Sequence, residues 1–159
     1  MRNRNVSIYL AGPIDGVPED DAREWRQAVG QMAPVGVLCF SPAHAYFGAS
    51  AATARELHYL NHRALEGCDA VLAYLRGPGR AFGTIREIEA ARQMHKPTAV
   101  VGLKPDESLM TYDLMVCDNL DGAVTAILEA VAAMRKRDGM PIAFLQGMMR
   151  PPDQEDDAA

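Results

Sequence analysis

The stretch from Cys68 to Met94, CDAVLAYLRGPGRAFGTIREIEAARQM, contains the pattern that decides the fold. Its residues 70–75 form an apolar run of strand length, and residues 83–94 have the apolar spacing of a helix. The residues between them include two glycines and a proline, which are typical of a loop. A strand, a loop and a helix in this order form the first part of a crossover unit, which leads to a parallel strand in the same sheet.

The same alternation extends along most of the chain. Apolar runs predict strands at 6–10, 35–40, 70–75 and 98–103, with a possible short fifth at 114–116. Helical periodicity predicts helices at 19–32, 50–65, 83–94 and 123–137. We therefore predict a single doubly wound α/β domain, flavodoxin-like or Rossmann-like, with a parallel sheet of about five strands. The domain is expected to span residues 1–150, followed by a mobile acidic tail at 151–159.

Composition excludes several classes of function. Of the 159 residues, 48% are hydrophobic and 23% are charged, as in an ordinary soluble domain. The net charge of −5 and the lack of a basic stripe argue against a nucleic acid polymer as partner. A secretory signal and an apolar run of ~20 residues are both missing, so we expect no membrane contact. Three widely spaced cysteines, Cys39, Cys68 and Cys117, predict reduced thiols in a cytoplasmic protein.

The histidines give no metal-binding pattern. His44, His58, His62 and His95 lack the spacing of a ligand cluster, so we expect no metal and interpret each as a surface or packing residue.

Glu87 is the first candidate for chemistry. In a doubly wound fold, ligands bind beyond the carboxyl ends of the strands, where the loop before Glu87 would lie. The predicted helix puts Glu87 in its first or second turn, where the positive end of the helix favours an ionised carboxylate that could act as a nucleophile. An acidic residue that only complements the helix dipole is the alternative interpretation.

Three further residues stand at informative places. Asp69 opens an apolar strand, where a charge must be paired or exposed, so it is either a site residue or a cap at the edge of the sheet. Tyr9 lies in the first strand, as a site residue or a core aromatic. Gly12 follows that strand and permits a sharp turn and close approach of a ligand.

Taken in order, several motifs resemble one family. They are IYLAGPI at 8–14, Asn61, CDAVLA at 68–73, and Gly83-Thr84-x-x-Glu87-Ile88-x-x-Ala91 with Lys96-Pro97 after it. This ordered set resembles the nucleoside 2-deoxyribosyltransferase family from about Ile8 to Asn119.

The resemblance implies a reaction and roles for particular residues. Glu87 would attack the anomeric carbon of a 2-deoxyribonucleoside, expel the base and form a covalent deoxyribosyl ester, which a second nucleobase then attacks. Tyr9 would position Glu87, and Asp69 would contact the base or handle its proton. Substrate contacts are expected at Ala11, Gly12, Pro13 and Gly83. The partners would be a nucleoside or nucleotide and a free nucleobase, and the reaction requires no cofactor.

Asp118 and Asn119 resemble a family pair that reaches into a neighbouring subunit and holds the 5′-hydroxyl of the sugar. The resemblance implies a homodimer or higher homo-oligomer with composite active sites. An Asp-Asn turn before the last helix explains the same residues equally well. We also interpret the methionine-rich segment 140–149 as part of a subunit interface.

Two departures from the family pattern keep other functions open. Ala81 stands where many members have an additional aspartate, and Glu89 replaces a common glycine. They favour a 2′-deoxynucleoside 5′-monophosphate N-glycosidase, in which water replaces the accepting base and Asp69 serves as the acid. The acidic loop at 14–21 would repel a 5′-phosphate, so transfer remains our preferred reaction. A non-catalytic nucleoside or nucleotide sensor is the alternative from another class.

Overall fold

A five-stranded parallel sheet forms the centre of the protein in the computed structural model, which describes residues 5–48, 53–76, 80–103 and 113–138. The strands are β1 (Val6–Ala11), β2 (Val37–Phe40), β3 (Ala70–Tyr74), β4 (Thr98–Val101) and β5 (Met115–Cys117). Their order is β2-β1-β3-β4-β5, and every neighbouring pair is parallel. This is the flavodoxin-like order, so the predicted fold class is confirmed.

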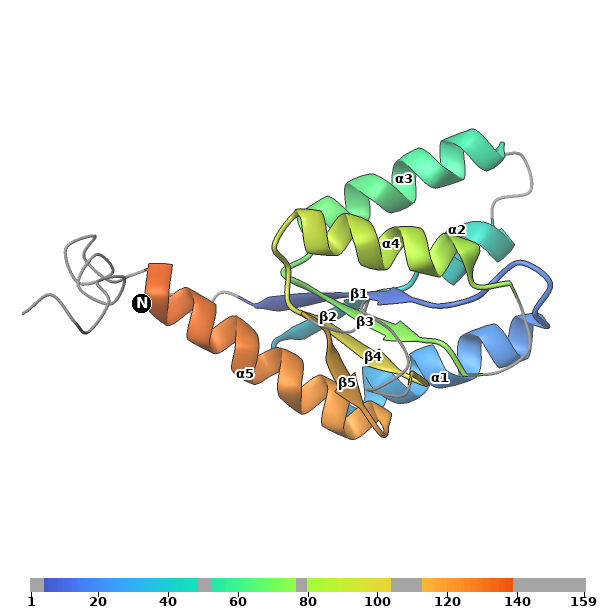
Figure 1. Cartoon of the computed structure of the whole chain (residues 1–159). Helices are drawn as coiled ribbons and strands as arrows, with labels where there is room; N and C mark the ends of the chain where they lie inside the picture. Colours follow the sequence, from blue (N-terminus) through green and yellow to red (C-terminus); the bar gives the residue numbers. More distant parts are fainter. Residues whose placement is uncertain (1–4, 49–52, 77–79, 104–112, 139–159) are drawn as a thin grey trace, which may run out of the picture.

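Helices cover both faces of the sheet. They are α1 (Glu19–Met32), α2 (Pro42–Gly48), α3 (Ala54–Gly67), α4 (Phe82–Gln93) and α5 (Leu120–Asp138). α3 and α4 lie together on one face, whereas α1 and α5 lie on the other (Figure 1). No helix among the described residues is long and apolar enough to cross a bilayer.

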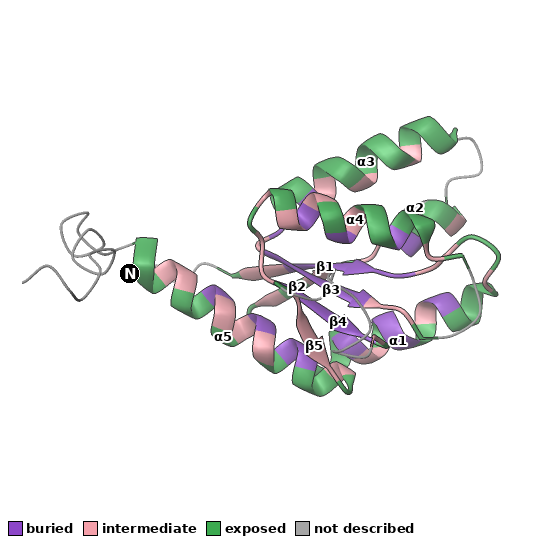
Figure 2. Ribbon diagram, viewed as in Figure 1, coloured by how far each residue is buried: buried purple, intermediate pink, exposed green. Residues whose placement is uncertain are grey.

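The two faces of the sheet contribute to two separate cores. Alternation along β1 directs Ile8 and Leu10 toward α1 and α5, and Tyr9 and Ala11 toward α3 and α4. All four side chains are at most 1% exposed. Buried residues therefore occupy β1, β3, β4 and the inner sides of the helices, while the outer sides of the helices are exposed (Figure 2).

Most element boundaries agree with the sequence prediction, with one missed helix. The sequence predicts no helix between the strand at 35–40 and the helix at 50–65, but α2 begins there at Pro42. Proline suits that position because its missing N–H would have no partner within the helix. α3 begins after Thr53, which forms a capping box with Glu56. The predicted domain end, the acidic tail and the segment 140–149 lie outside the described residues.

Gly12 is required by packing rather than by a turn. A Cβ atom at Gly12 would lie 2.5 Å from Cζ2 of Trp25 and 3.2 Å from the carbonyl oxygen of Tyr74. Trp25 is 7% exposed and stacks on Tyr74 with ring centroids 5.0 Å apart, so it has little room to yield. Gly12 also has no positive φ. The expectation of a sharp turn at Gly12 is therefore corrected: a glycine is needed here because the chain packs closely against Trp25 of α1.

We expect Gly12→Ala to lower the free energy of unfolding by about 1–3 kcal/mol, because the new methyl group overpacks the contact with Trp25. Gly30→Ala is the matched control: Gly30 lies in α1 with nothing within 4 Å of the added Cβ, so the change should stabilise the helix slightly. Denaturant unfolding of both variants measures the difference. Equal stabilities would contradict the packing role of Gly12.

Candidate active site

Tyr9 and Glu87 form the centre of the site. The Oη of Tyr9 donates a hydrogen bond to Oε1 of Glu87 over 2.6 Å, although the two residues are 78 positions apart. Tyr9 is fully buried in β1, and its ring stacks on Phe40 of β2 with centroids 5.6 Å apart. Since the tyrosine is held by the sheet, it fixes one oxygen of the carboxylate on α4.

Burial controls the protonation of this pair. It raises the pKa of Glu87 to about 7, although the hydrogen bond from Tyr9 and the charge of Arg26 both oppose the shift. Burial and the charge of Glu87 also raise the pKa of Tyr9, so the phenol remains a donor. The sequence favoured an ionised Glu87 at the helix end, but Glu87 lies in the second turn and burial is the largest influence on its pKa, which lies above the ordinary value.

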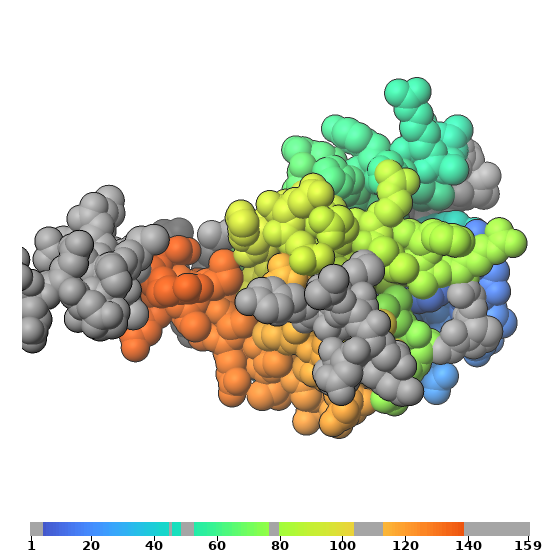
Figure 3. All heavy atoms as spheres, viewed as in Figure 1, coloured from blue at the N-terminus to red at the C-terminus, as the bar shows by residue number. Residues whose placement is uncertain are grey.

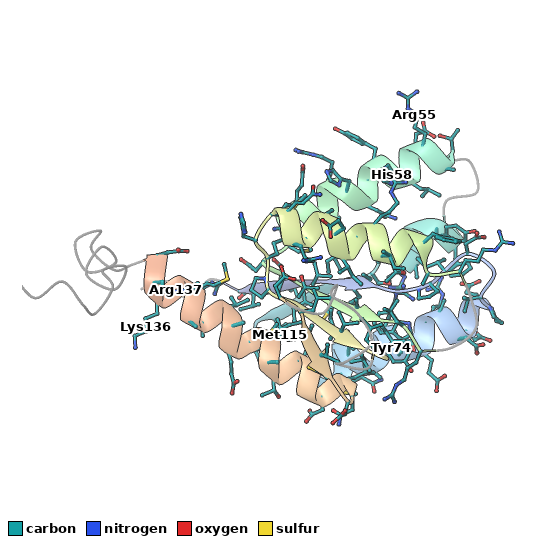
Figure 4. The ribbon with its side chains drawn as sticks, in the orientation of Figure 1. Arg55, His58, Tyr74, Met115, Lys136 and Arg137 are labelled. Carbon is teal, nitrogen blue, oxygen red and sulfur yellow. The ribbon has the colours of Figure 1, made fainter. Side chains whose placement is uncertain are left out.

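Glu87 opens into a cavity of about 770 Å³ between α3 and α4, a size suited to a small molecule. Figure 3 shows α4 packed against α3 on this side of the protein. His58 lies on the side of α3 that faces α4, whereas Arg55 projects away from the helix pair (Figure 4). The polar side chains that line the cavity with Glu87 are Asp15, Tyr46, His58, Asn61, His62 and Arg86.

The wall formed by α3 was missed by sequence reasoning. His58 and His62, interpreted as surface or packing residues, both line the cavity with ring centroids 6.4 Å apart. Asn61, which belongs to the ordered motif, has a buried Oδ1 without a hydrogen-bond partner. That oxygen is free to accept a hydrogen bond from a ligand. The spacing of 58, 61, 62 and 65 along one helix face was the signal available in the sequence.

The predicted substrate-binding residues divide into two groups. Gly83 lines the cavity, as expected. The side chain of Ala11 is fully buried in the core, Gly12 packs on Trp25, and Pro13 faces a separate small cavity, so none of the three lines the cavity of Glu87. From this loop it is Asp15 that reaches the site.

Asp69 lies away from this cavity, at the amino end of β3. Its Oδ2 accepts hydrogen bonds from the backbone N–H and the hydroxyl of Ser7, each over 2.8 Å, and Oδ1 lies 3.4 Å from Nη2 of Arg135. Burial opposes ionisation of Asp69, but the bonds from Ser7 and the charge of Arg135 outweigh it and lower its pKa. The structure does not bring Asp69 to Glu87, so the expected contact with a base is corrected to a cap at the edge of the sheet.

Asp69→Asn should therefore lower the free energy of unfolding by about 1–2 kcal/mol, because charge-assisted bonds to Ser7 and Arg135 are lost. The pKa of Asp69 is lower in the folded protein than in the unfolded chain, where it lies near 4. The stabilisation is therefore complete at a pH above the pKa of the unfolded chain, and it is lost as the pH falls through the pKa of the folded protein. Denaturant unfolding at pH 7 and at pH 3 should show a smaller difference from wild type at the lower pH. A variant with unchanged stability but without catalysis would contradict the capping role.

Asp118 and Asn119 lie outside the cavity that the same chain forms around Glu87. The Oδ1 of Asn119 accepts a hydrogen bond from the N–H of Gly122 over 2.8 Å, at the start of α5. The carbonyl oxygen of Asp118 accepts one from Nη2 of Arg76 over 2.9 Å. These contacts match the turn interpretation of the pair, and the role in a neighbouring subunit stays a prediction.

Within the described part of the chain, no group of three or more His, Cys, Asp or Glu side chains could hold a metal ion. Cys39, Cys68 and Cys117 are free thiols.

We expect Tyr9→Phe to raise the pKa of Glu87 by about one unit above its value near 7, because the ionised carboxylate loses its donor while the ring still packs on Phe40. A ¹³C NMR titration of the Glu87 carboxyl measures this change. Tyr74→Phe is the control, since Tyr74 stacks on Trp25 and packs with the core on the other face of the sheet. An unchanged titration in Tyr9→Phe would show that the hydrogen bond has no influence on Glu87.

The fold and the half-buried carboxylate define a class: a small flavodoxin-like α/β protein with a cavity between α3 and α4. Residues 5–107 match the family model described as nucleoside 2-deoxyribosyltransferase like, and the chain belongs to this family. Membership indicates a nucleoside-modifying enzyme as its general function. No curated protein matches the sequence.

Solved structures support the fold assignment. A 2-deoxyribosyltransferase from Bacillus psychrosaccharolyticus has a TM-score of 0.55 at 14% identity, with 88% of this chain and 96% of that chain covered. A 2-desoxiribosyltransferase from Leishmania mexicana has a TM-score of 0.52 at 19% identity, with coverage of 80% and 97%. The solution structure of BlsM has a TM-score of 0.58 at 19% identity, with coverage of 89% and 99%.

Proposed function

We propose that this protein cleaves the N-glycosidic bond of a 2-deoxyribonucleoside through Glu87 and transfers the sugar to another nucleobase. The observation that carries the proposal is the Tyr9–Glu87 hydrogen bond of 2.6 Å at the wall of a cavity of about 770 Å³. A carboxylate held in this way suits a nucleophile, because its position is fixed before the substrate arrives.

The proposed reaction has two displacements. An oxygen of Glu87 bonds to C1′ while the C1′–N bond breaks, and the electron pair leaves with the base, which takes up a proton. A nitrogen of the second base then bonds to C1′, loses its proton, and releases the carboxylate. Both transition states resemble an oxocarbenium ion, which a carboxylate stabilises, and two inversions retain the configuration. Tyr9 binds Oε1, which leaves Oε2 available for attack.

The departing base requires a proton donor. Ala81 has no acidic group and Asp69 is bound to Ser7 and Arg135, so neither suits this role. His58 and His62 line the cavity opposite Glu87, and histidine transfers protons readily near neutral pH. We therefore assign the base to the α3 side of the cavity and the sugar to the Glu87 side.

The monophosphate N-glycosidase remains a second candidate because of one observation. The acidic loop at 14–21 contributes only Asp15 to the described cavity wall, whereas Arg86, His58 and His62 could all carry positive charge there. Such groups favour a 5′-phosphate. Water would then replace the second base in the same mechanism.

The proposal includes a homo-oligomer. Asp118 and Asn119 are exposed next to the carboxyl end of β5 and outside their own chain's cavity, so they would reach a sugar only in a second subunit.

Chromatography of the products tests the proposed function. We expect the protein, given deoxyinosine or deoxyuridine with a different free base, to form a new deoxynucleoside. Glu87→Gln should reduce the rate at least ~10³-fold, because the amide cannot replace the nucleophile. Glu89→Gln is the matched control, since Glu89 is exposed on the same helix and pairs with Arg92.

Parallel reactions with the matching 5′-monophosphates separate the candidates. Deoxyribose 5-phosphate and free base, formed only from the monophosphates, would replace transfer with hydrolysis. Binding without turnover of either substrate would instead favour the sensor, and full activity of Glu87→Gln would contradict the mechanism.

A further inference from the structure

A separate cavity lies on the other face of the sheet from Glu87. Its volume is about 220 Å³, and its wall is formed by α1, by β2 and by the start of α2. Leu10 of β1 also lines it, and alternation along that strand directs Leu10 and Tyr9, the partner of Glu87, to opposite faces. No described residue lines both this cavity and that of Glu87, so a ligand here would occupy a site of its own.

Hydrogen-bond donors dominate the polar part of this wall. The side chains with nitrogen or oxygen atoms that line the cavity are Arg23, Arg26, Gln27, Ser41 and His44. No carboxylate is among the described residues of the wall, although the chain as a whole has a net charge of −5. Leu10 and Arg26 are buried, whereas Gln27, Gly30 and His44 are exposed and form the rim. A cavity with a cationic floor, an open rim and no acidic group suits an anion.

Arg26 provides the buried positive charge in this wall. It is 4% exposed, and burial lowers its pKa to about 10, so it stays protonated at neutral pH. Its Nη2 donates to the carbonyl oxygen of Gly12 over 2.9 Å and its Nη1 to that of Ala22 over 2.5 Å, but its Nε is buried without a hydrogen-bond partner. Among the described residues, no carboxylate forms an ion pair with Arg26. A buried cation without a counterion is costly, and an anion in the cavity would offset that cost.

Arg23 and His44 add further donors on the rim side of the wall. Nε and Nη2 of Arg23 donate to Oε1 of Glu19 over 2.7 and 2.6 Å, and its Nη1 lies 3.2 Å from Nδ1 of His44. Because arginine can only donate, Nδ1 of His44 accepts, and the neutral ring carries its proton on Nε2. The ring therefore keeps a donor for a ligand, as does the hydroxyl of Ser41. Glu19 offsets the charge of Arg23, so the charge left without a counterion is that of Arg26.

The size of the cavity and the directions of its donors indicate the kind of anion. A volume of about 220 Å³ equals roughly seven water molecules at ~30 Å³ each, which is small for a drug-sized ligand. The donors come from α1 on one side and from Ser41 and His44 on the other. A carboxylate accepts within one plane, whereas a phosphate group has oxygens that point in several directions.

We propose that this cavity binds a small phosphate-bearing anion, with Arg26 as its buried charge and with further donors from α1, Ser41 and His44. Either inorganic phosphate or a small phosphate monoester could supply this group. The site does not depend on the reaction proposed for Glu87, because the two cavities share no described residue.

Titration with phosphate, followed in ¹H–¹⁵N NMR spectra of the full chain, tests this site. We expect saturable shifts of the amide signals of α1, Ser41 and His44, with a Kd for inorganic phosphate at or below about 1 mM. A parallel titration with ribose 5-phosphate distinguishes the two sources, because the natural one should bind more tightly. Acetate at the same ionic strength is the control anion. Equal affinity for acetate would overturn the assignment to phosphate.

Two pairs of variants separate a specific site from general attraction of an anion. Arg23→Gln should weaken phosphate binding about tenfold, whereas Arg63→Gln removes an exposed arginine that pairs with Glu66 on α3 and should leave it unchanged. Gly30→Glu places a carboxylate at the rim and should also weaken binding about tenfold, whereas Gly30→Gln should stay within about threefold of wild type. No atom lies within 4 Å of a Cβ added at Gly30, so this pair should fold normally.

Three results would overturn this site. The first is a set of shifts confined to α3 and α4, which would place the phosphate in the cavity of Glu87. The second is an affinity that neither Arg23→Gln nor Gly30→Glu changes, and the third is a lack of saturation up to about 20 mM phosphate. If Arg23→Gln does not fold, the two Gly30 variants decide alone.

Discussion

The hydrogen bond between Tyr9 and Glu87 is the interaction on which the site depends. It joins the central part of the sheet to α4, and its tyrosine has no exposed surface. The bond forms only because alternation along β1 directs Tyr9 toward α4, while Ile8 and Leu10 fill the opposite core. A shift of one residue in the register of β1 would exchange these two sets of side chains and leave Glu87 without its partner.

The chemistry of Glu87 results from a balance between burial and neighbouring charges. Desolvation alone would keep the carboxyl of Glu87 protonated. The hydrogen bond from Tyr9 and the charge of Arg26 both lower its pKa, so a larger fraction of the carboxyl is ionised. A pKa of about 7 leaves a large ionised fraction at neutral pH while the group remains in a poorly hydrated place. Such a carboxylate is a better nucleophile than a fully hydrated one because it has less bound water to lose.

The sequence predicted the fold well, because strands and helices depend on local patterns, whereas the pairing of Tyr9 with Glu87 followed only from the resemblance to a family. Apolar runs and helical spacing were sufficient for β1, α1 and α4, and the ordered motif identified Tyr9 and Glu87. The errors arose where the environment of a side chain is determined by distant residues. Asp69 is held by Ser7 and Arg135, from the opposite ends of the described chain. Helical spacing could have indicated that His58, Asn61 and His62 share one face of a helix. That this face lines a cavity follows only from the packing of α3 beside α4.

The most direct test of the central claim is intact-protein mass spectrometry after rapid mixing with a 2-deoxyribonucleoside and acid quenching. A covalent mechanism predicts a mass increase of one deoxyribosyl group, located by peptide mapping on the segment that contains Glu87 and absent in Glu87→Gln. Release of the base from the nucleoside without any adduct on that segment would contradict the role of Glu87 as the nucleophile.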